Sequence, residues 1–346
     1  MASVEIKSID EVASRLLAIN GVSQASIDIV LDTINFANQR GVPTHGVGRL
    51  PLYIKKIRAG NLNPKDEIET VTDSGAVAIL DAHGCLGQVA AKRAIDLAIE
   101  KAACYGIAAV GVQNSNNFGM AGYFGDYAAK KGMAALIFAN ASPAIAPTGG
   151  KEKLLGTNPL CFAFPGGSKH WPVVLDMATS VVARGKIRLA AKNEEKIPLD
   201  WALDENGQPT DDPKEALKGS LLPFGGYKGY GLSLFVDIFA GLLTGSAFAG
   251  GVEQLSKMDS FSNNGHLFIV MDSKRFMSEA ELDERVDYLV QRVKACGEPD
   301  TVRLPGESGY AKMTTHIETV ELPETQISEI NHLAEEFGLA ERLKIV

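Results

Sequence analysis

Three short, nearly continuous apolar segments constrain the fold of this chain more than any other feature. They cover residues 75–82, 107–114 and 133–140, and their length and apolar character predict buried strands. Helical segments at 88–104 and 121–131 lie between them, and a glycine follows each one. Strands that alternate with helices in this way predict a βαβαβ unit and a mostly parallel sheet.

Two later apolar segments change that expectation. Residues 159–165 and 172–177 are separated by a short stretch that contains Gly166 and Gly167, which favours an antiparallel hairpin. A further strand is predicted at 266–272. The sheet is therefore expected to be mixed, with both parallel and antiparallel pairs.

The two ends of the chain have helical patterns. The first forty residues are predicted to be helical, with Ser8 and Glu11 at the spacing of a capping box and a second helix at about 24–40. Further helices are predicted at 278–295 and 324–341.

The length of the chain and its polar stretches bear on its organisation. With 346 residues, of which 45% are hydrophobic, the chain can bury a substantial core and is expected to form two domains. Segments 186–220 and 246–263 are polar and glycine-rich in places and are interpreted as long loops or lids.

Charge and cysteine usage exclude several classes of function. The net charge of −8 argues against a nucleic-acid partner, because phosphate neutralisation needs a basic surface. The cysteines lack any C-x-x-C pair, which favours a reducing compartment over a zinc site or a disulfide framework. The N-terminus lacks a signal-peptide pattern, and the longest apolar stretch, 231–245, is too short to span a bilayer. These features predict a cytoplasmic protein without a membrane partner.

Familiar catalytic and nucleotide-binding motifs are absent from the sequence. No G-x-G-x-x-G follows a strand, and the glycines of 148–156 do not have Walker A spacing. No histidine pair has the spacing of metal ligands, and no G-x-S-x-G elbow occurs, so neither a metal site nor a hydrolase is predicted. Any nucleotide site must therefore be built differently from a Rossmann site.

The segment 40–60 carries the first cluster of candidate residues. Thr44 and His45 are predicted on a loop between helices, and Arg49 and Tyr53 follow at i, i+4 spacing on one helical face. A histidine can transfer a proton near neutral pH, an arginine can bind a carboxylate through two hydrogen bonds, and a tyrosine hydroxyl can bind the same substrate. Alternatively, His45 caps a helix and the cations form a solvated face.

Other segments suit nucleotide or anion binding only in combination. The run 114–125 contains three asparagines and three glycines between a strand and a helix, although such residues also mark ordinary turns. Asp176 lies at a predicted strand end, and Lys186 and Lys228 stand next to glycines, where they could hold a pyrophosphate. Taken alone, each feature is better explained by an ordinary loop or turn.

In their order along the chain, these motifs resemble the malate/L-lactate dehydrogenase family of type-2 2-hydroxyacid oxidoreductases. That group includes ureidoglycolate dehydrogenase, 2,3-diketogulonate reductase, sulfolactate dehydrogenase and piperideine-2-carboxylate reductase. The resemblance covers nearly the whole chain and rests on the following motifs: RGVPTHGVGRLPLY, APTGG, GTNP, LDMATS, GGYKGYGL and RLPGE.

The resemblance implies an α/β (α+β) fold that is not a Rossmann fold. The sheet would be mixed and mostly antiparallel, and the absence of the Rossmann fingerprint agrees with this rather than with the parallel reading. A helical domain at 1–74 would be completed by C-terminal helices, a mixed-sheet cofactor-binding domain would cover 75–272, and the helices of 273–346 would pack back on the helical domain. Members of the family are expected to be homodimers.

The resemblance also assigns roles to residues. His45 would be the catalytic acid/base and Arg49 the carboxylate clamp, with substrate binding completed by Thr44, Tyr53, Thr157 and Asn158. NAD or NADP would contact the following residues: Asp176, Met177, Ala178, Lys186, Tyr227, Lys228, Gly306 and Glu307. Arg184, Lys186 and Lys228 are candidates to bind a 2′-phosphate, so the sequence leaves NADH versus NADPH open.

One position departs from the pattern of many relatives. Where they carry a histidine before F-G, this chain has Asn117, whose amide cannot transfer a proton at neutral pH. Either His45 transfers the proton alone, with Asn117 orienting the substrate or the nicotinamide carboxamide, or the enzyme acts on a different subset of substrates, which disfavours ureidoglycolate.

The resulting hypothesis is a nicotinamide-dependent dehydrogenase that acts on the CH–OH group of a small 2-hydroxy acid. Two alternatives stay open: a reductase of a cyclic 2-imino acid, which needs the same clamp and proton donor, and a non-catalytic metabolite-binding protein of the same fold.

Overall fold

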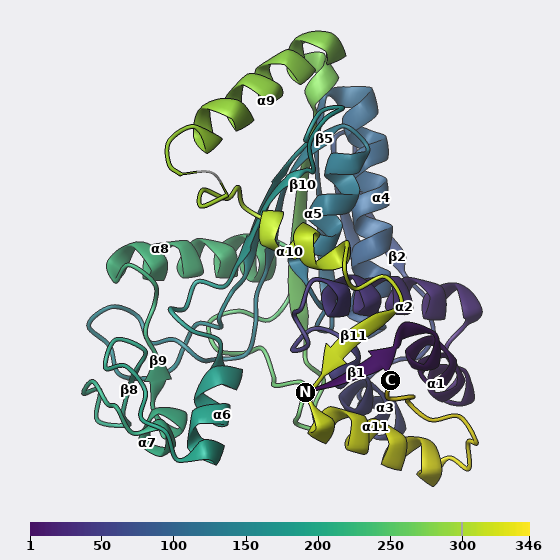
Figure 1. The fold of residues 1–346 in the computed structure, drawn as a ribbon, viewed down its shortest axis with the longest axis vertical. Coiled ribbons are helices and arrows are strands. Elements are labelled where there is room, and N and C mark those ends of the chain that lie inside the picture. The colour runs from purple at the N-terminus through teal and green to yellow at the C-terminus, as the bar shows by residue number, and fades with distance from the viewer. Residues whose placement is uncertain (299) are drawn as a thin grey trace.

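The computed structural model describes residues 1–298 and 300–346, and a seven-stranded sheet forms its centre (Figure 1). The strands lie in the order β2-β3-β4-β10-β5-β6-β7. Only β3 and β4 pair in parallel, and every other neighbouring pair in this sheet is antiparallel. The strand bounds are as follows: β2 Glu69–Ser74, β3 Val77–Asp81, β4 Ile107–Ser115, β10 Asn264–Asp272, β5 Met133–Ala139, β6 Leu160–Phe164 and β7 Val173–Met177.

The parallel reading of 75–140 is correct only for its first half. Strands β3 and β4 form a parallel pair connected by helix α4, as the alternation of strand and helix predicts. Strand β10, however, lies between β4 and β5 and is antiparallel to both, so the sheet is mixed and mostly antiparallel. The hairpin of β6 and β7 is confirmed.

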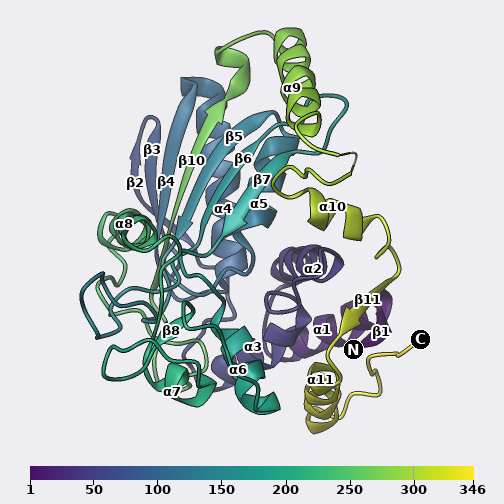
Figure 2. The same cartoon turned by 60° about the vertical axis from the view of Figure 1, so that its left-hand side comes forward.

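Helices α4 (Gly87–Tyr105) and α5 (Ala121–Lys130) cover one face of the sheet (Figure 2). Their buried positions are mostly alanines, which let the helix backbones approach the strands closely. Phe124 on α5 and Phe268 on β10 are completely buried between the layers. This alanine-rich packing predicts a rigid sheet, and the functional loops leave its ends.

A second core joins both ends of the chain. It contains buried residues from the N-terminal helices, from β11 and from α11. Within 273–346, α9 contributes nothing to this cluster and forms a small one of its own at the far end of the sheet (Figure 1). The elements concerned are β1 Ala2–Glu5, α1 Ile6–Ile19, α2 Gln24–Gln39, α3 Leu50–Arg58, α9 Glu279–Lys294, α10 Glu307–Met313, β11 Thr319–Leu322 and α11 Glu324–Glu336.

The capping box predicted at Ser8 and Glu11 is wrong. The first residues form β1, which pairs with β11 from the other end of the chain, and α1 begins at Ile6. Ser8 is therefore already inside the helix, and its hydroxyl donates to the carbonyl of Glu5. Ser278 and Glu281, by contrast, form a complete capping box at the start of α9.

The prediction of a long loop at 186–220 is wrong. This segment contains two short helices and two short strands around a small core. These are α6 Arg184–Asn193, β8 Ala202–Leu203, α7 Pro213–Lys218 and β9 Ser220–Leu221. The apolar stretch at 231–245 overlaps α8 Tyr227–Val236 and the π-helix η2 Asp237–Leu242, and one side of it packs on the second face of the sheet. Segment 246–263 has no helix or strand, in line with the prediction.

No helix in the described part of the chain is long and apolar enough to cross a membrane.

Strand β10 should carry a large share of the stability, because its pairing holds both halves of the sheet together. We expect Phe268→Ala to lower the free energy of unfolding by about 3–5 kcal/mol, since it removes a completely buried ring. Urea unfolding measures this change. The exposed Phe276 provides the control, and Phe276→Ala should change the free energy of unfolding by less than about 0.5 kcal/mol. Equal effects of the two variants would contradict the assigned position of β10.

Candidate active site

The loop after α2 brings Thr44, His45 and Arg49 together. The Thr44 hydroxyl lies 3.0 Å from His45 Nδ1, and Arg49 Nε donates to the Thr44 carbonyl at 2.6 Å. Because Nδ1 already faces the Thr44 hydroxyl, His45 Nε2 is the ring nitrogen left for a ligand. The predicted acid/base and carboxylate clamp therefore belong to one hydrogen-bonded turn.

Asn38 on α2 holds this turn in place. Its Oδ1 accepts a hydrogen bond from the Val47 N–H at 3.2 Å. A Cβ added to Gly46 would lie only 1.7 Å from the same oxygen, so the residue after His45 must be glycine for the contact to form. This gives a physical reason for the T-H-G sequence.

The electrostatic surroundings of His45 are set by burial and by the neighbouring Arg49 charge. His45 is half-buried, and burial together with the nearby Arg49 charge lowers the pKa of its imidazole to about 4. Arg49 has no carboxylate within ion-pair distance in the described part of the chain. The turn therefore presents a neutral imidazole beside an uncompensated cation, an arrangement suited to a small anion.

Tyr53 occupies a different position from the one the sequence suggests. Its side chain is completely buried, and its hydroxyl lies between Gln88 Nε2 at 2.9 Å and Asn117 Oδ1 at 3.3 Å. Tyr53 therefore lies in the protein interior, where its hydroxyl contacts Asn117. Gln88, at the start of α4, was missed at the sequence level, because one glutamine in an apolar helix carries no recognisable signal.

The segment after Asn117 leads to Asp176. The backbone N–H of Gly122, in the first turn of α5, donates to Asp176 Oδ2 at 2.7 Å. Burial raises the pKa of the Asp176 carboxyl to about 6, and the Gly122 hydrogen bond and the Arg40 charge partly offset this rise. Met177 and Ala178, the other predicted cofactor contacts of this motif, follow directly and are half-buried.

Three loops that are far apart in the sequence meet at Thr179. The carbonyl of Thr157 accepts hydrogen bonds from both the N–H and the hydroxyl of Thr179, and the Phe224 N–H donates to the Thr179 carbonyl. Asn158 is completely buried, with Nδ2 donating to the Ser233 carbonyl and Oδ1 accepting from Ala141 N–H. Its amide is therefore used within the protein, whereas Thr157 stays partly accessible.

Three of the predicted cofactor contacts lie on exposed surfaces. Lys186, Tyr227 and Lys228 are exposed, and neither lysine has an ion-pair partner among the described residues. The N-terminus of α6 lies next to the turn of Thr44, His45 and Arg49, because a Cβ added to Gly185 would lie 3.9 Å from Thr44 Cγ2.

The R-L-P-G-E loop is held by Arg40. One guanidinium nitrogen of Arg40 donates to the Gly306 carbonyl at 2.9 Å, and the group lies between the rings of Phe36 and Tyr310. Glu307 is already paired with Lys294 and accepts from the Leu304 N–H. Arg40 therefore fixes the position of this loop through its hydrogen bond to the backbone.

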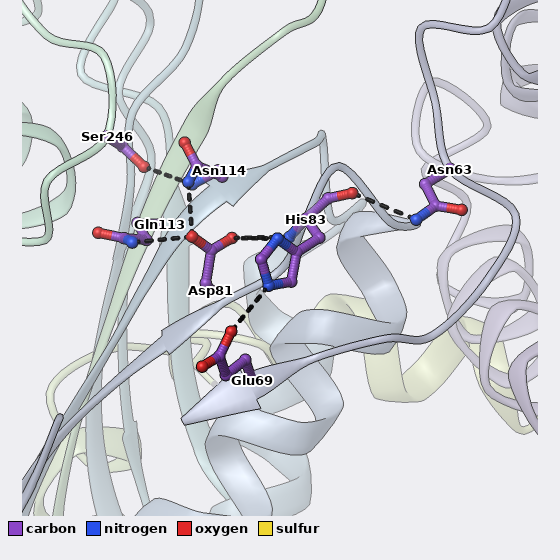
Figure 3. Close-up of polar contacts among 7 residues, drawn as sticks. All are labelled: Asn63, Glu69, Asp81, His83, Gln113, Asn114 and Ser246. Atoms are coloured by element: carbon purple, nitrogen blue, oxygen red, sulfur yellow. Dashed lines mark hydrogen bonds and ion pairs between the residues drawn. The ribbon is translucent and has the colours of Figure 1, made fainter. Parts of the chain in front are cut away.

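A separate polar cluster lies at the ends of β3 and β4 (Figure 3). Although burial opposes it, hydrogen bonds from the His83 N–H and from Gln113 and Asn114 lower the pKa of the Asp81 carboxyl. His83 also contacts Glu69 at 3.3 Å. A neighbouring cavity of about 520 Å³ contains none of the predicted site residues. No group of three potential metal-binding side chains occurs among residues 1–298 and 300–346.

Comparison with known proteins identifies the family. A sequence model of the malate/L-lactate dehydrogenase family matches residues 4–331. The malate/(S)-sulfolactate dehydrogenase of Methanothermus fervidus is 38% identical over 326 residues, which cover 94% of this chain and 95% of that protein. An NADP⁺-dependent (2R)-3-sulfolactate dehydrogenase of Chromohalobacter salexigens is 34% identical over 332 residues, covering 96% and 98% of the two chains.

A solved structure agrees with this assignment. The sulfolactate dehydrogenase of Methanocaldococcus jannaschii superposes with a TM-score of 0.91 at 36% identity, covering 97% of this chain and 98% of that one. The mixed, mostly antiparallel sheet and the motif residues thus occur in a chain that belongs to the malate/L-lactate dehydrogenase family.

Proposed function

We propose that the protein interconverts a small 2-hydroxy acid and its 2-oxo acid by hydride transfer with NAD or NADP. The observation that carries this proposal is the turn that places the neutral His45 imidazole beside Arg49, which has no carboxylate partner among the described residues. An acid/base next to a cation that can bind a carboxylate is what oxidation at the carbon beside a carboxylate requires.

Arg49 is proposed to bind the substrate carboxylate. Its Nε is held by the Thr44 carbonyl, so the guanidinium plane is oriented before a ligand arrives. The two terminal nitrogens then form a planar pair of donors for the two carboxylate oxygens. This orientation brings the neighbouring carbinol or ketone oxygen toward His45.

His45 is proposed to move the proton at Nε2. In oxidation, the neutral imidazole accepts the hydroxyl proton as the carbonyl forms; in reduction, it returns the proton to the oxygen. The bound carboxylate offsets the Arg49 charge, which removes one cause of the low pKa of His45 and favours protonation in the reductive complex.

The three loops joined at Thr179 fit a dinucleotide. Gly225 and Gly226 precede α8 with positive φ values and open space around them, and no side chain caps the first N–H groups of that helix. Such a helix start suits a pyrophosphate, and Lys186 and Lys228 add charge. Asp176, Met177, Ala178 and Tyr227 would hold the remainder, with Gly306 and Glu307 toward the adenosine end. When bound, the nicotinamide supplies or accepts the hydride.

The choice between NAD and NADP is proposed to depend on cations of α6 and α8. Lys186 is exposed without an ion-pair partner among the described residues, whereas Arg184 donates to the Leu217 carbonyl. A 2′-phosphate would therefore select Lys186 or Lys228 before Arg184.

Activity can be tested by following absorbance at about 340 nm while NADH and NADPH are offered in turn with 2-oxo acids and a cyclic 2-imino acid. Oxidation of the reduced nucleotide in the presence of an oxo acid supports the proposal. Oxidation of the nucleotide with the imino acid alone supports the reductase alternative. Nucleotide binding without turnover of any acid supports the non-catalytic alternative.

A homodimer is proposed on physical grounds. Along α8 and η2, one side is buried against the sheet, whereas Leu232, Phe235, Leu242 and Leu243 on the other are 41–58% exposed. A helix that is apolar on all sides needs covering on all sides. A second copy can cover this strip with its own across a twofold axis.

The four free cysteines support the proposed cytoplasmic location, where thiols stay reduced.

We expect His45→Gln to lower kcat by about 10²-fold or more, because an amide cannot transfer the proton. Steady-state rates in both directions measure the change, and an unchanged melting temperature shows that the fold is intact. Wild-type turnover in the variant would exclude His45 as the acid/base.

The pH profile tests the same role. Reduction needs protonated His45, which the free enzyme loses as pH rises through about 4, so kcat/KM for reduction should fall continuously from about pH 5 to pH 8. Oxidation uses the neutral form and should lose kcat/KM only as pH falls toward about 4. A plateau for reduction below about pH 6, as an ordinary histidine would give, contradicts the lowered pKa.

Arg49→Lys should raise KM for the acid by about tenfold or more, because a point charge cannot replace two parallel hydrogen bonds. The KM for the nucleotide should change by less than about twofold, since Arg49 is proposed to contact only the acid. An equal loss for both ligands would contradict the clamp.

Phe235→Glu should dissociate the dimer, because a charge on the apolar strip would be buried without a partner. Sedimentation velocity gives the mass of the particle. The control is Phe276→Glu, which changes an even more exposed ring outside the strip, 71% against 57% for Phe235. A wild-type monomer, or a dimer that persists in Phe235→Glu, would rule out this interface.

A further inference from the structure

Gln88, Tyr53 and Asn117 form a row of hydrogen-bonded side chains behind the catalytic turn. Gln88 and Tyr53 are completely enclosed, and Asn117 is half-buried at the start of the loop that follows β4. Tyr53 stands one helical turn after Arg49 in the sequence, and the Arg49 charge acts on both Tyr53 and His45.

The direction of every proton in this row follows from one backbone group. The Gly119 N–H can only donate, and it meets the Asn117 side chain at 3.3 Å, so the atom that it meets is the carbonyl oxygen Oδ1. Tyr53 lies 3.3 Å from the same oxygen and must therefore donate its proton to it. The Tyr53 oxygen is then an acceptor, which Gln88 satisfies with its NH₂ group at 2.9 Å.

This arrangement leaves two polar groups without a partner among the described residues. Gln88 Oε1 is buried and accepts no hydrogen bond, which is costly in a protein interior. Asn117 Nδ2, at the accessible end of the row, donates none. Turning the Gln88 amide would let Oε1 accept the Tyr53 proton. The Tyr53 oxygen would then need a donor from Asn117, whereas the Gly119 N–H needs the Asn117 oxygen in the same place.

We propose that Gln88, acting through the Tyr53 hydroxyl, is a positioning residue that keeps Asn117 as a hydrogen-bond donor toward the substrate's 2-oxo group. This inference rests on the proposed function. The Asn117 amide accepts two hydrogen bonds on its protein side, so only its NH₂ group is free to face a ligand. A donor in that place stabilises the negative charge that develops on the ketone oxygen during hydride addition.

The same polarity selects among substrate classes. The oxygen of a 2-oxo acid accepts hydrogen bonds and pairs with Asn117 Nδ2. A protonated cyclic imine presents an N–H group, which would face the NH₂ of Asn117 donor to donor. Desolvated like-to-like polar contacts discriminate strongly between ligands, because both groups lose their water partners. The row therefore favours 2-oxo acids over cyclic 2-imino acids.

A double-mutant cycle tests the row. We expect Gln88→Leu and Tyr53→Phe each to lower kcat/KM for the 2-oxo acid by about tenfold, and the double variant to be no slower than Tyr53→Phe alone. Without the hydroxyl, Gln88 has no route to Asn117. Asn35→Leu is the matched control, because half-buried Asn35 also has a buried, unpaired Oδ1 but donates to Asp10 on α1. It should lower the melting temperature while kcat/KM stays within about twofold.

The possible outcomes distinguish a failure of the proposed role of Gln88 from a failure of the proposed function. If the wild type turns over an oxo acid but the Gln88 and Tyr53 effects multiply, the row is overturned and the proposed function stands. If the wild type turns over no oxo acid with either nucleotide, both are overturned.

Asn117→Asp gives an independent result, because it replaces the outward NH₂ group with an acceptor of the same shape. It should lower kcat/KM for the oxo acid by about tenfold or more and shift the preference toward the cyclic imine. Unchanged preference would show that the amide does not face the reacting group.

Discussion

The pairing of β10 with both β4 and β5 is the interaction on which the rest of the molecule depends. It joins two halves of the sheet that would otherwise each end in an open edge, and its hydrogen bonds determine where the strand ends lie. At its start, buried His266 contacts the Ser115 hydroxyl and stacks on Phe118, which fixes the segment that carries Asn117. Asn140 at the end of β5 accepts the Gly265 N–H in the same region. The segments that follow β4 and β5 therefore leave a shared, rigid edge of the sheet.

The sequence predicted those parts of the fold that local patterns encode. The first three apolar strands, the intervening helices and the β6–β7 hairpin all depend on neighbours within about twenty residues. The insertion of β10 and the pairing of β1 with β11 join segments that are far apart, and periodicity contains no information about such partners. Ser8 shows the same limit on a small scale, because the capping spacing is real but a strand already occupies the preceding residues.

The candidate site was predictable to a similar degree. Motif order located Thr44, His45 and Arg49, which the structure places on one turn. It could not show that Tyr53 points into the protein or that Asn158 has no free polar atom, because burial depends on tertiary packing. Gln88 was invisible for the same reason: its importance depends entirely on the two groups beside it.

The junction at Thr179 has a consequence for how such a protein can change over evolutionary time. The chain leaves this junction before α6 and returns after β9, where the Leu222 carbonyl accepts the Val181 N–H and closes the excursion at its base. The excursion therefore has fixed endpoints, and it shares its small core with Ala144, Ile145 and Leu155 of the loop that precedes β6. Its length and surface can diverge without displacing the strands or the catalytic turn, while its first helix stays beside Thr44. Changes on the exposed surface of this excursion thus alter the surroundings of the Thr44 turn while the sheet and the turn itself stay as they are.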